Sequence, residues 1–249
     1  MAIANRPLSV VVGIFFIAYY LALGYVKWYL HGPEMLWEML WVCNTSIVLS
    51  GIFMLIGYMP GVEQMIMVIP SVHATWVLDA ASYLLFGVFP IGTAAYLANP
   101  HDILETSFTF HHVWFIPLSC LVLYKNGKIC AHSWVWGSVN ACTFLMLARY
   151  SGSPVHLNVN QCYHWSYDLK IPIVHLFDDS HGVFFITYYI FIYCGLMNGA
   201  AWVVLRVFSY FALDEAAAPA EKKRNRVINW WNVFMIVIAY DGILLVQNF

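Results

Sequence analysis

The chain has 249 residues, of which 62% are hydrophobic and only 10% are charged, and its formal net charge is -2. An ordinary soluble domain carries roughly 25% charged residues, so this composition argues against a water-soluble fold. The near-neutral charge and the lack of an arginine-rich arm argue against nucleic acid as a partner.

Apolar runs of about twenty residues, the length that crosses a bilayer, recur along the whole chain. The first run, 8–26, follows Arg6 and resembles a signal peptide, but it is long and has no convincing small-residue cleavage site. We therefore interpret it as a retained helix. Six further spans are predicted at 36–58, 73–97, 104–124, 130–148, 183–211 and 228–248. The expected fold is all-α: one domain over 1–249, a polytopic membrane bundle of about seven transmembrane helices.

The orientation follows from the distribution of Lys and Arg, because positive residues are retained on the cytoplasmic side. Seven of them fall on the side of the amino terminus: Arg6, Lys125, Lys128, Lys222, Lys223, Arg224 and Arg226. Three fall on the opposite side: Lys27, Arg149 and Lys170. The amino terminus is therefore expected in the cytoplasm and the carboxyl terminus outside. Either an endomembrane or a bacterial inner membrane fits this pattern.

Four polar side chains from four predicted spans are expected at one depth in the non-cytoplasmic half. With a rise of about 1.5 Å per residue, Cys43 and His112 each lie roughly 10 Å inside that end of their spans. Asn140 and Asp241 lie at a similar level, with Tyr240 beside Asp241. Because ionisable and polar groups are costly in a bilayer, each is a candidate functional residue. We expect Cys43, His112, Asn140 and Asp241 to line one cavity.

Structural roles remain open for these residues. Cys43 alone could be a small buried hydrophobe, and Asn140 could form a hydrogen bond between helices. Asp241 could be neutral or pair with Arg149. Asp79 is predicted in the cytoplasmic half of its span, far from the other four, in helix packing or a separate polar site.

One long connection, 149–181, carries four of the ten histidines and lies on the predicted non-cytoplasmic face. A connection of this length in a compact chain is usually a lid, a binding loop or a docking surface. Its histidines, His156, His164, His175 and His181, do not match the spacing of a zinc motif. The only histidine doublet, His111 and His112, lacks the repeated clusters of di-iron enzymes. No metal and no cofactor are therefore predicted.

The remaining chemistry is that of a nucleophile at the membrane surface. A thiol becomes useful when a base takes its proton, and a third group commonly orients that base. Cys43 with His112, oriented by Asp241 or Asn140, provides these residue types. In a lipid-facing cavity the natural substrate is an acyl ester or thioester. Attack on it gives an acyl-enzyme that passes to an alcohol, a lysolipid or water.

Four short segments carry a resemblance to a known superfamily: 43–49 (CNTSIVL), 111–117 (HHVWFIP), 155–162 (VHLNVNQC) and 195–198 (GLMN). The chain resembles the superfamily of androgen-induced and androgen-dependent-TFPI-regulating lipid hydrolases, transmembrane-protein-164 acyltransferases and bacterial YwaF-like membrane proteins. There, a Thr or Cys nucleophile works with a His five residues before a proline. The resemblance implies this pairing for Cys43 and His112, with Pro117.

The matching segments also supply expected substrate-contacting residues, together with Tyr240: Asn44, His111, Asn158 and Asn160. Two features depart from the hydrolase pattern. Ser46 stands where the hydrolases have an acidic residue, and the spacing from nucleophile to histidine is shorter. A cysteine nucleophile is more similar to the acyltransferase branch.

The sequence thus predicts a lipid acyltransferase or acyl-ester hydrolase whose partners are membrane lipids. The alternative is a non-catalytic subunit of a larger membrane complex. It is supported by the 18% aromatic content and eleven tryptophans, which serve lipid belts or contacts with other membrane subunits. A receptor or transporter is a third possibility.

Overall fold

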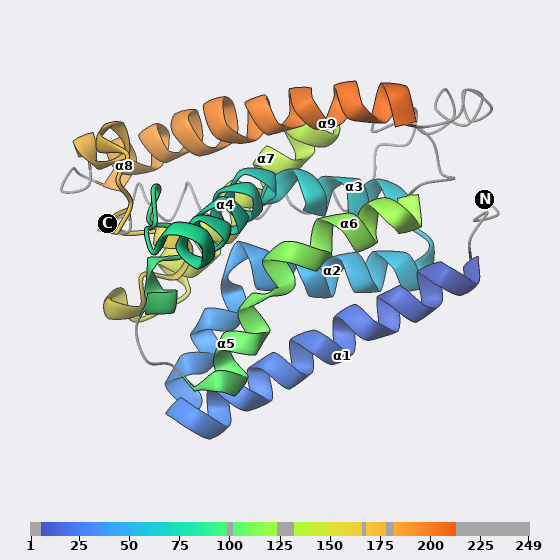
Figure 1. Cartoon of the computed structure of the whole chain (residues 1–249), viewed down its shortest axis with the longest axis horizontal. Helices are drawn as coiled ribbons and strands as arrows, with labels where there is room; N and C mark the ends of the chain where they lie inside the picture. Colours follow the sequence, from blue (N-terminus) through green and yellow to red (C-terminus); the bar gives the residue numbers. More distant parts are fainter. Residues whose placement is uncertain (1–5, 99–101, 124–131, 166–167, 178–181, 213–249) are drawn as a thin grey trace.

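The computed structural model describes residues 6–98, 102–123, 132–165, 168–177 and 182–212, and all regular secondary structure among them is helical (Figure 1). The all-α prediction is therefore confirmed for this part of the chain. In Figure 1, helix α1 (Arg6–His31) lies along one side and the helices of 182–212 lie along the opposite side.

Three helical segments in the described residues are long and apolar enough to cross a membrane: Arg6–His31, Ile103–Leu123 and Ile186–Val207. Two bent helix pairs raise the number to five if each pair counts as one span. These numbers fit a membrane protein, while the expected seven spans are matched only in part. The predicted span 228–248, with Tyr240 and Asp241, lies outside the described residues.

The predicted span 36–58 is broken rather than continuous. A 3-10 helix, η1 (Pro33–Leu40), meets α2 (Val42–Ile56) at a bend of 72°. Trp41 between them has an extended backbone, with φ -52° and ψ 135°, so helical hydrogen bonding stops there. As a consequence, Cys43 is the second residue of α2 and not a mid-span residue.

The next predicted span, 73–97, begins earlier and ends earlier than expected. The chain first forms α3 (Met59–Val68), which is buried at every residue except Pro60, and then α4 (Pro70–Phe86), with a bend of 53° between them. Gly87 ends α4 in the left-handed conformation, with φ 70°, which glycine adopts without steric cost. An inner helix, α3, thus precedes α4 where the sequence predicted a connection.

Asp79 was expected in helix packing or in a separate polar site, away from Cys43, and it does not line the cavity described below. Its carboxylate accepts hydrogen bonds from the backbone N–H groups of Ile91, at 2.8 Å, and Ala94, at 3.1 Å. Asp79 therefore holds the segment after α4, and the neighbouring Thr93 lines the pocket described below.

The break between α3 and α4 is stabilised by side chains from the opposite end of the sequence. Tyr193 Oη and Asn198 Nδ2 both donate to the carbonyl of Val68, at 2.7 and 3.0 Å, and Ser71 Oγ donates to Asn198 Oδ1 at 2.6 Å. A buried backbone carbonyl without a hydrogen-bond partner costs free energy. These hydrogen bonds therefore stabilise the break between α3 and α4.

The remaining helices agree broadly with the predicted spans. The span 104–124 corresponds to α5 (Ile103–Thr109) and α6 (His111–Leu123), and 130–148 corresponds to α7 (Ser133–Tyr150). The span 183–211 corresponds to three consecutive elements: α8 (Gly182–Tyr189), a π-helix η6 (Ile190–Met197) and α9 (Asn198–Ala212). Short 3-10 turns complete the described elements: η2 (Ala95–Ala98), η3 (Val155–Leu157), η4 (Val159–Gln161) and η5 (Pro172–Phe177).

Helices α1 and α2 approach closely through two glycines. A Cβ atom on Gly13 would lie 2.9 Å from the Gly51 carbonyl oxygen, whereas one on Gly24 would lie 3.5 Å from the flexible end of Met39. Gly13→Ala is therefore expected to destabilise the protein by about 1–3 kcal/mol, and Gly24→Ala on the same helix should be neutral or slightly stabilising. Thermal unfolding in detergent measures both. Equal thermal unfolding midpoints for the two variants would contradict the close approach of α1 and α2 at Gly13.

Candidate functional site

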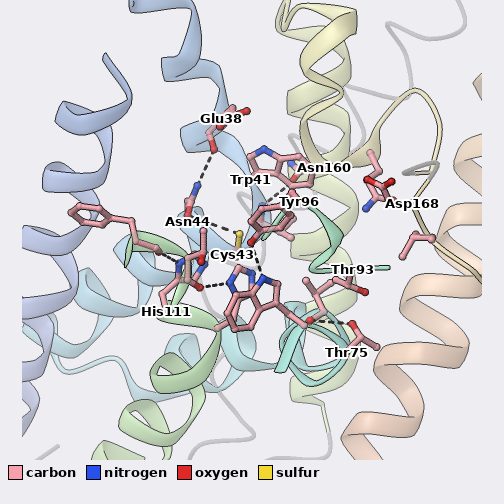
Figure 2. A pocket seen from close by; sticks show the side chains of 18 of the residues that line it. Glu38, Trp41, Cys43, Asn44, Thr75, Thr93, Tyr96, His111, Asn160 and Asp168 are labelled. Atoms are coloured by element: carbon pink, nitrogen blue, oxygen red, sulfur yellow. Dashed lines mark hydrogen bonds between the residues drawn. The ribbon is translucent and has the colours of Figure 1, made fainter. Parts of the chain in front are cut away.

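A cavity of about 490 Å³ lies where the broken helices meet (Figure 2). Its wall is formed by α1, the η1–α2 junction, α4, α5, the start of α6, η6 and the connection 149–181. Much of the lining is aromatic: Trp41, Trp76, Tyr96, Phe108, Trp165, Tyr189 and Tyr193. An apolar cavity with a few convergent polar groups is the usual form of a small-molecule or lipid site.

Cys43 lies in the first turn of α2 and lines this cavity. Its thiol is 3.9 Å from Asn44 Oδ1, while Asn44 Nδ2 donates to the Glu38 carbonyl at 2.9 Å. Figure 2 shows the Asn44 amide between Glu38 and the Cys43 sulfur. The Asn44 side chain is therefore fixed by the backbone of η1 and directs the thiol.

Two histidines from the start of α6 meet this cysteine. The Cys43 sulfur and one ring nitrogen each of His111 and His112 all lie within 4.8 Å of one another. Cys43 and His112 were expected at the same depth, and the structure brings them together. His111, expected only as a substrate contact, belongs to the same group of three.

Backbone carbonyls of α5 fix the orientation of both histidines. His111 Nδ1 lies 2.7 Å from the Phe108 carbonyl, and His112 Nδ1 lies 2.7 Å from the Thr109 carbonyl. Because a carbonyl oxygen can only accept, each Nδ1 carries the hydrogen and each Nε2 carries a lone pair. A backbone carbonyl therefore orients His112, a role for which Asn140 or Asp241 was predicted; Asp241 lies outside the described residues.

His73, in the first turn of α4, completes a cluster of three imidazoles. Its ring centroid lies 4.7 Å from that of His112 and 5.8 Å from that of His111. The His73 side chain is 2% exposed, and neither ring nitrogen has a hydrogen-bond partner in the described residues. Trp76 stacks on His112 with centroids 4.9 Å apart and planes 13° from parallel. The sequence analysis missed His73, although its position inside a predicted span was the available signal.

Charged residues form one end of the cavity. Lys27 Nζ pairs with Glu38 and, at 3.3 Å, with Glu105, and Glu105 lies 3.0 Å from His31 Nε2. Lys27, Glu38 and Glu105 all line the cavity. Two carboxylates, one ammonium and one imidazole are thus grouped at this end of the cavity. The cavity is therefore amphipathic, with a charged end and an aromatic body.

Tyr96 adds a polar group that stays neutral. Its hydroxyl accepts a hydrogen bond from Trp76 Nε1 at 2.7 Å, and burial raises the pKa of Tyr96 to about 12. A phenol with this pKa keeps its proton at physiological pH. It lines the cavity as a neutral hydroxyl, not as a base.

The connection 149–181 forms part of the cavity wall, as a binding loop would. Asn160, an expected substrate contact, mainly supports the backbone: its Oδ1 accepts from Val42 N at 2.6 Å. Its Nδ2 donates to the carbonyls of Leu40 and Phe144, at 2.9 and 3.1 Å. Although Asn160 borders the cavity, its side chain replaces the missing cap of α2. Asn160 thus has a structural role at the start of α2 in addition to its place on the cavity wall, where a substrate contact was expected.

Two other expected site residues lie elsewhere. Asn140 does not line the cavity, because its Nδ2 donates to Gln64 Oε1 at 3.3 Å between α7 and α3. The expectation that it shares a cavity with Cys43 is wrong, since the inner helix α3 takes the place next to α7. Asn158 does not line the cavity either; it binds the backbone of Tyr163 and His164, at 3.0 and 2.8 Å, and folds the loop. Asp241 and Tyr240 lie outside the described residues.

The cavity thus joins a buried thiol, two imidazoles with lone pairs aimed away from their carbonyl partners, and an amphipathic volume. Such a set can support a thiol nucleophile with its base, and its sulfur and nitrogen atoms also suit a transition metal. Comparisons with protein-family models, curated proteins and solved structures find no match for this chain.

Proposed function

We propose that this chain is a multi-pass membrane protein that transfers or hydrolyses an acyl group of a membrane lipid. Cys43 is the nucleophile and His112 its general base. The observation that carries the proposal is the approach of the Cys43 sulfur to a His112 ring nitrogen, within 4.8 Å, on the wall of an amphipathic cavity. Apo catalytic pairs are often this loose and tighten when substrate binds.

The orientation of His112 suits a base. Its Nδ1–H donates to the Thr109 carbonyl, so Nε2 has the lone pair that accepts a proton, and the Trp76 stack holds the ring plane. The Cys43 thiol donates that proton to Nε2 as its sulfur attacks the acyl carbonyl carbon. His112 then returns the proton to the departing alcohol. The thioester passes its acyl group to a second alcohol, a lysolipid or water by the same steps in reverse.

The first turn of α2 supplies stabilisation for the negative charge that develops. The backbone N–H groups of Cys43 and Asn44 interact with the Cys43 sulfur, at the end of the helix where the dipole is positive. These contacts partly offset the cost that burial imposes on a negatively charged sulfur. The same N–H groups are positioned to donate to the oxyanion of a tetrahedral intermediate, an interaction worth about 2.7–4 kcal/mol in known enzymes.

The substrate class follows from the two ends of the cavity. The aromatic body suits an acyl chain, and the Lys27, Glu38 and Glu105 cluster suits a polar headgroup with hydrogen-bonding groups. This assignment agrees with the acyl-lipid chemistry implied by the resemblance to the lipid hydrolase and acyltransferase superfamily, to which we propose that the chain belongs.

An electrophilic probe tests the proposal directly. A long-chain acyl probe with a thiol-reactive carbonyl is expected to label Cys43 in the full-length protein in native membranes, as read by peptide mass spectrometry. Labelling should be lost in Cys43→Ala and kept in Cys120→Ala, whose cysteine lies on α6 outside the cavity. An unlabelled Cys43, together with an unchanged lipid profile on deleting the protein, would favour the non-catalytic subunit instead.

We also propose the seven-span topology, with the amino terminus in the cytoplasm. Its support is the excess of Lys and Arg on one side of the predicted spans. Single cysteines introduced in the 214–226 linker should be labelled from the cytoplasmic side, and those in the 149–181 connection from the opposite side. Labelling of both segments from one side would contradict the assignment.

A further inference from the structure

We propose that Cys43, His111 and His112 bind one divalent transition metal ion of the zinc class. Metal binding takes the same sulfur and imidazole that acyl transfer needs, so the metal inhibits that chemistry reversibly. The inference goes beyond the proposed function, because metal binding can be measured without any turnover.

The donor geometry is the first argument. One sulfur and two ring nitrogens lie within 4.8 Å of one another, close enough for a shift of side chains to place them around a single ion. Zinc binds thiolate at about 2.3 Å and imidazole at about 2.0–2.1 Å. One thiolate with two imidazoles is a borderline-soft set that favours zinc, cobalt or copper over magnesium or calcium.

The surroundings of the histidines are the second, independent argument. His111 Nδ1–H and His112 Nδ1–H each donate to a backbone carbonyl, and Tyr19 Oη lies 3.2 Å from His111 Nδ1. Metal-bound histidines are characteristically held in this way through the second nitrogen. The His111 Nε2 atom is buried and has no hydrogen-bond partner among the described residues. A buried polar atom without a partner costs free energy unless a ligand binds to it.

The surroundings of the three donors also suit the charge of a bound ion. Binding replaces the Cys43 thiol proton, which is released to solvent, so the ion with one thiolate and two neutral imidazoles carries one positive charge. Glu38 and Glu105 line the same cavity and bring two carboxylates against the single ammonium of Lys27, a setting that tolerates an added positive charge. His73 lies beside the donor set, with its ring centroid 4.7 Å from that of His112, and neither of its ring nitrogens has a hydrogen-bond partner among the described residues.

Sequence spacing could not reveal this site. The histidines that were considered for zinc lie in the 149–181 connection, and none of those belongs to this donor set. The observed donors come from two helices, α2 and α6, that are far apart in sequence and that both begin at the cavity.

Cobalt titration tests the metal site on the full-length protein, purified in detergent and stripped with a chelator. One Co²⁺ per chain should produce a thiolate-to-cobalt charge-transfer band that Zn²⁺ abolishes. Cys43→Ser should lose the band, and His73→Phe should weaken binding by about tenfold, as expected for a group outside the ligand set. Cys120→Ser and the exposed His156→Gln are matched controls that should bind as the unmodified protein does.

A second measurement does not depend on any variant folding. Zn²⁺ should protect Cys43 of the unmodified protein from maleimide, and the chelator should restore its reactivity, with Cys120 as the internal reference. Absence of the cobalt band and of zinc protection in the unmodified protein would overturn the proposal, as would a band that survives Cys43→Ser. Loss of probe labelling in metal-free protein that still binds cobalt would instead remove the acyl proposal and leave the metal site standing.

Discussion

Replacing Cys43 by Ala is expected to reduce acyl turnover to background, and His112→Ala should reduce it by about 10²–10⁴-fold, the usual contribution of a general base. The double variant should be no worse than Cys43→Ala, because a nucleophile and its base act as one unit and their effects are not additive. The measurement is the lipid product profile of membranes that carry equal amounts of each variant.

Two further substitutions sharpen this test. Cys43→Ser should keep a trace of activity, since His112 can still activate a hydroxyl, whereas His112→Gln should not recover any. Asn140→Ala is a matched control at a buried polar position outside the cavity and should leave the products unchanged at equal protein level. A His112→Ala variant that labels fully and shows an unchanged lipid profile would refute the mechanism.

The proximity of Cys43 and His112 could be predicted because each lies near the start of a long apolar segment. For these two residues, the position in the sequence and the rise per residue were enough to predict that they meet. The element types of α1, of Ile103–Leu123 and of Ile186–Val207 were also predictable, since long apolar runs have few alternatives.

Breaks inside the apolar runs account for most of what the sequence did not predict. The chain bends after Trp41 and after Ile69 because side chains far away in sequence, such as Asn160 and Tyr193, satisfy the freed backbone groups. Hydropathy does not report such long-range hydrogen bonds. An inner helix, α3, was therefore not recognised.

The errors at individual residues follow from that missed helix. Asn140 faces Gln64 of α3 instead of the cavity, and His73 lies in the first turn of α4 because that helix starts only after α3 has ended. A polar residue in a predicted span was correctly expected to have a hydrogen-bond partner. Which residue is that partner depends on how the chain folds in three dimensions, which the sequence pattern did not reveal.

The acyl chain is expected to occupy the aromatic body of the cavity, and narrowing it should change which substrates are used. Val72 lines the cavity on α4 and contacts the core. Val72→Trp should therefore exclude long acyl chains and lower long-chain turnover by at least about tenfold, while a short-chain probe should still label Cys43. The comparison of labelling by long-chain and short-chain probes measures this selectivity.

The matched control is Val77→Trp, on the same helix, because Val77 is exposed at 38% and does not line the cavity. It should leave labelling by both probes unchanged. Because Val72→Trp keeps Cys43, His111 and His112, a folded variant should also bind cobalt with its charge-transfer band intact. Equal loss of short-chain and long-chain labelling in a variant that still binds cobalt would mean that the aromatic body does not hold the acyl chain. The substrate would then have to reach Cys43 from the charged end of the cavity, past Lys27 and Glu105.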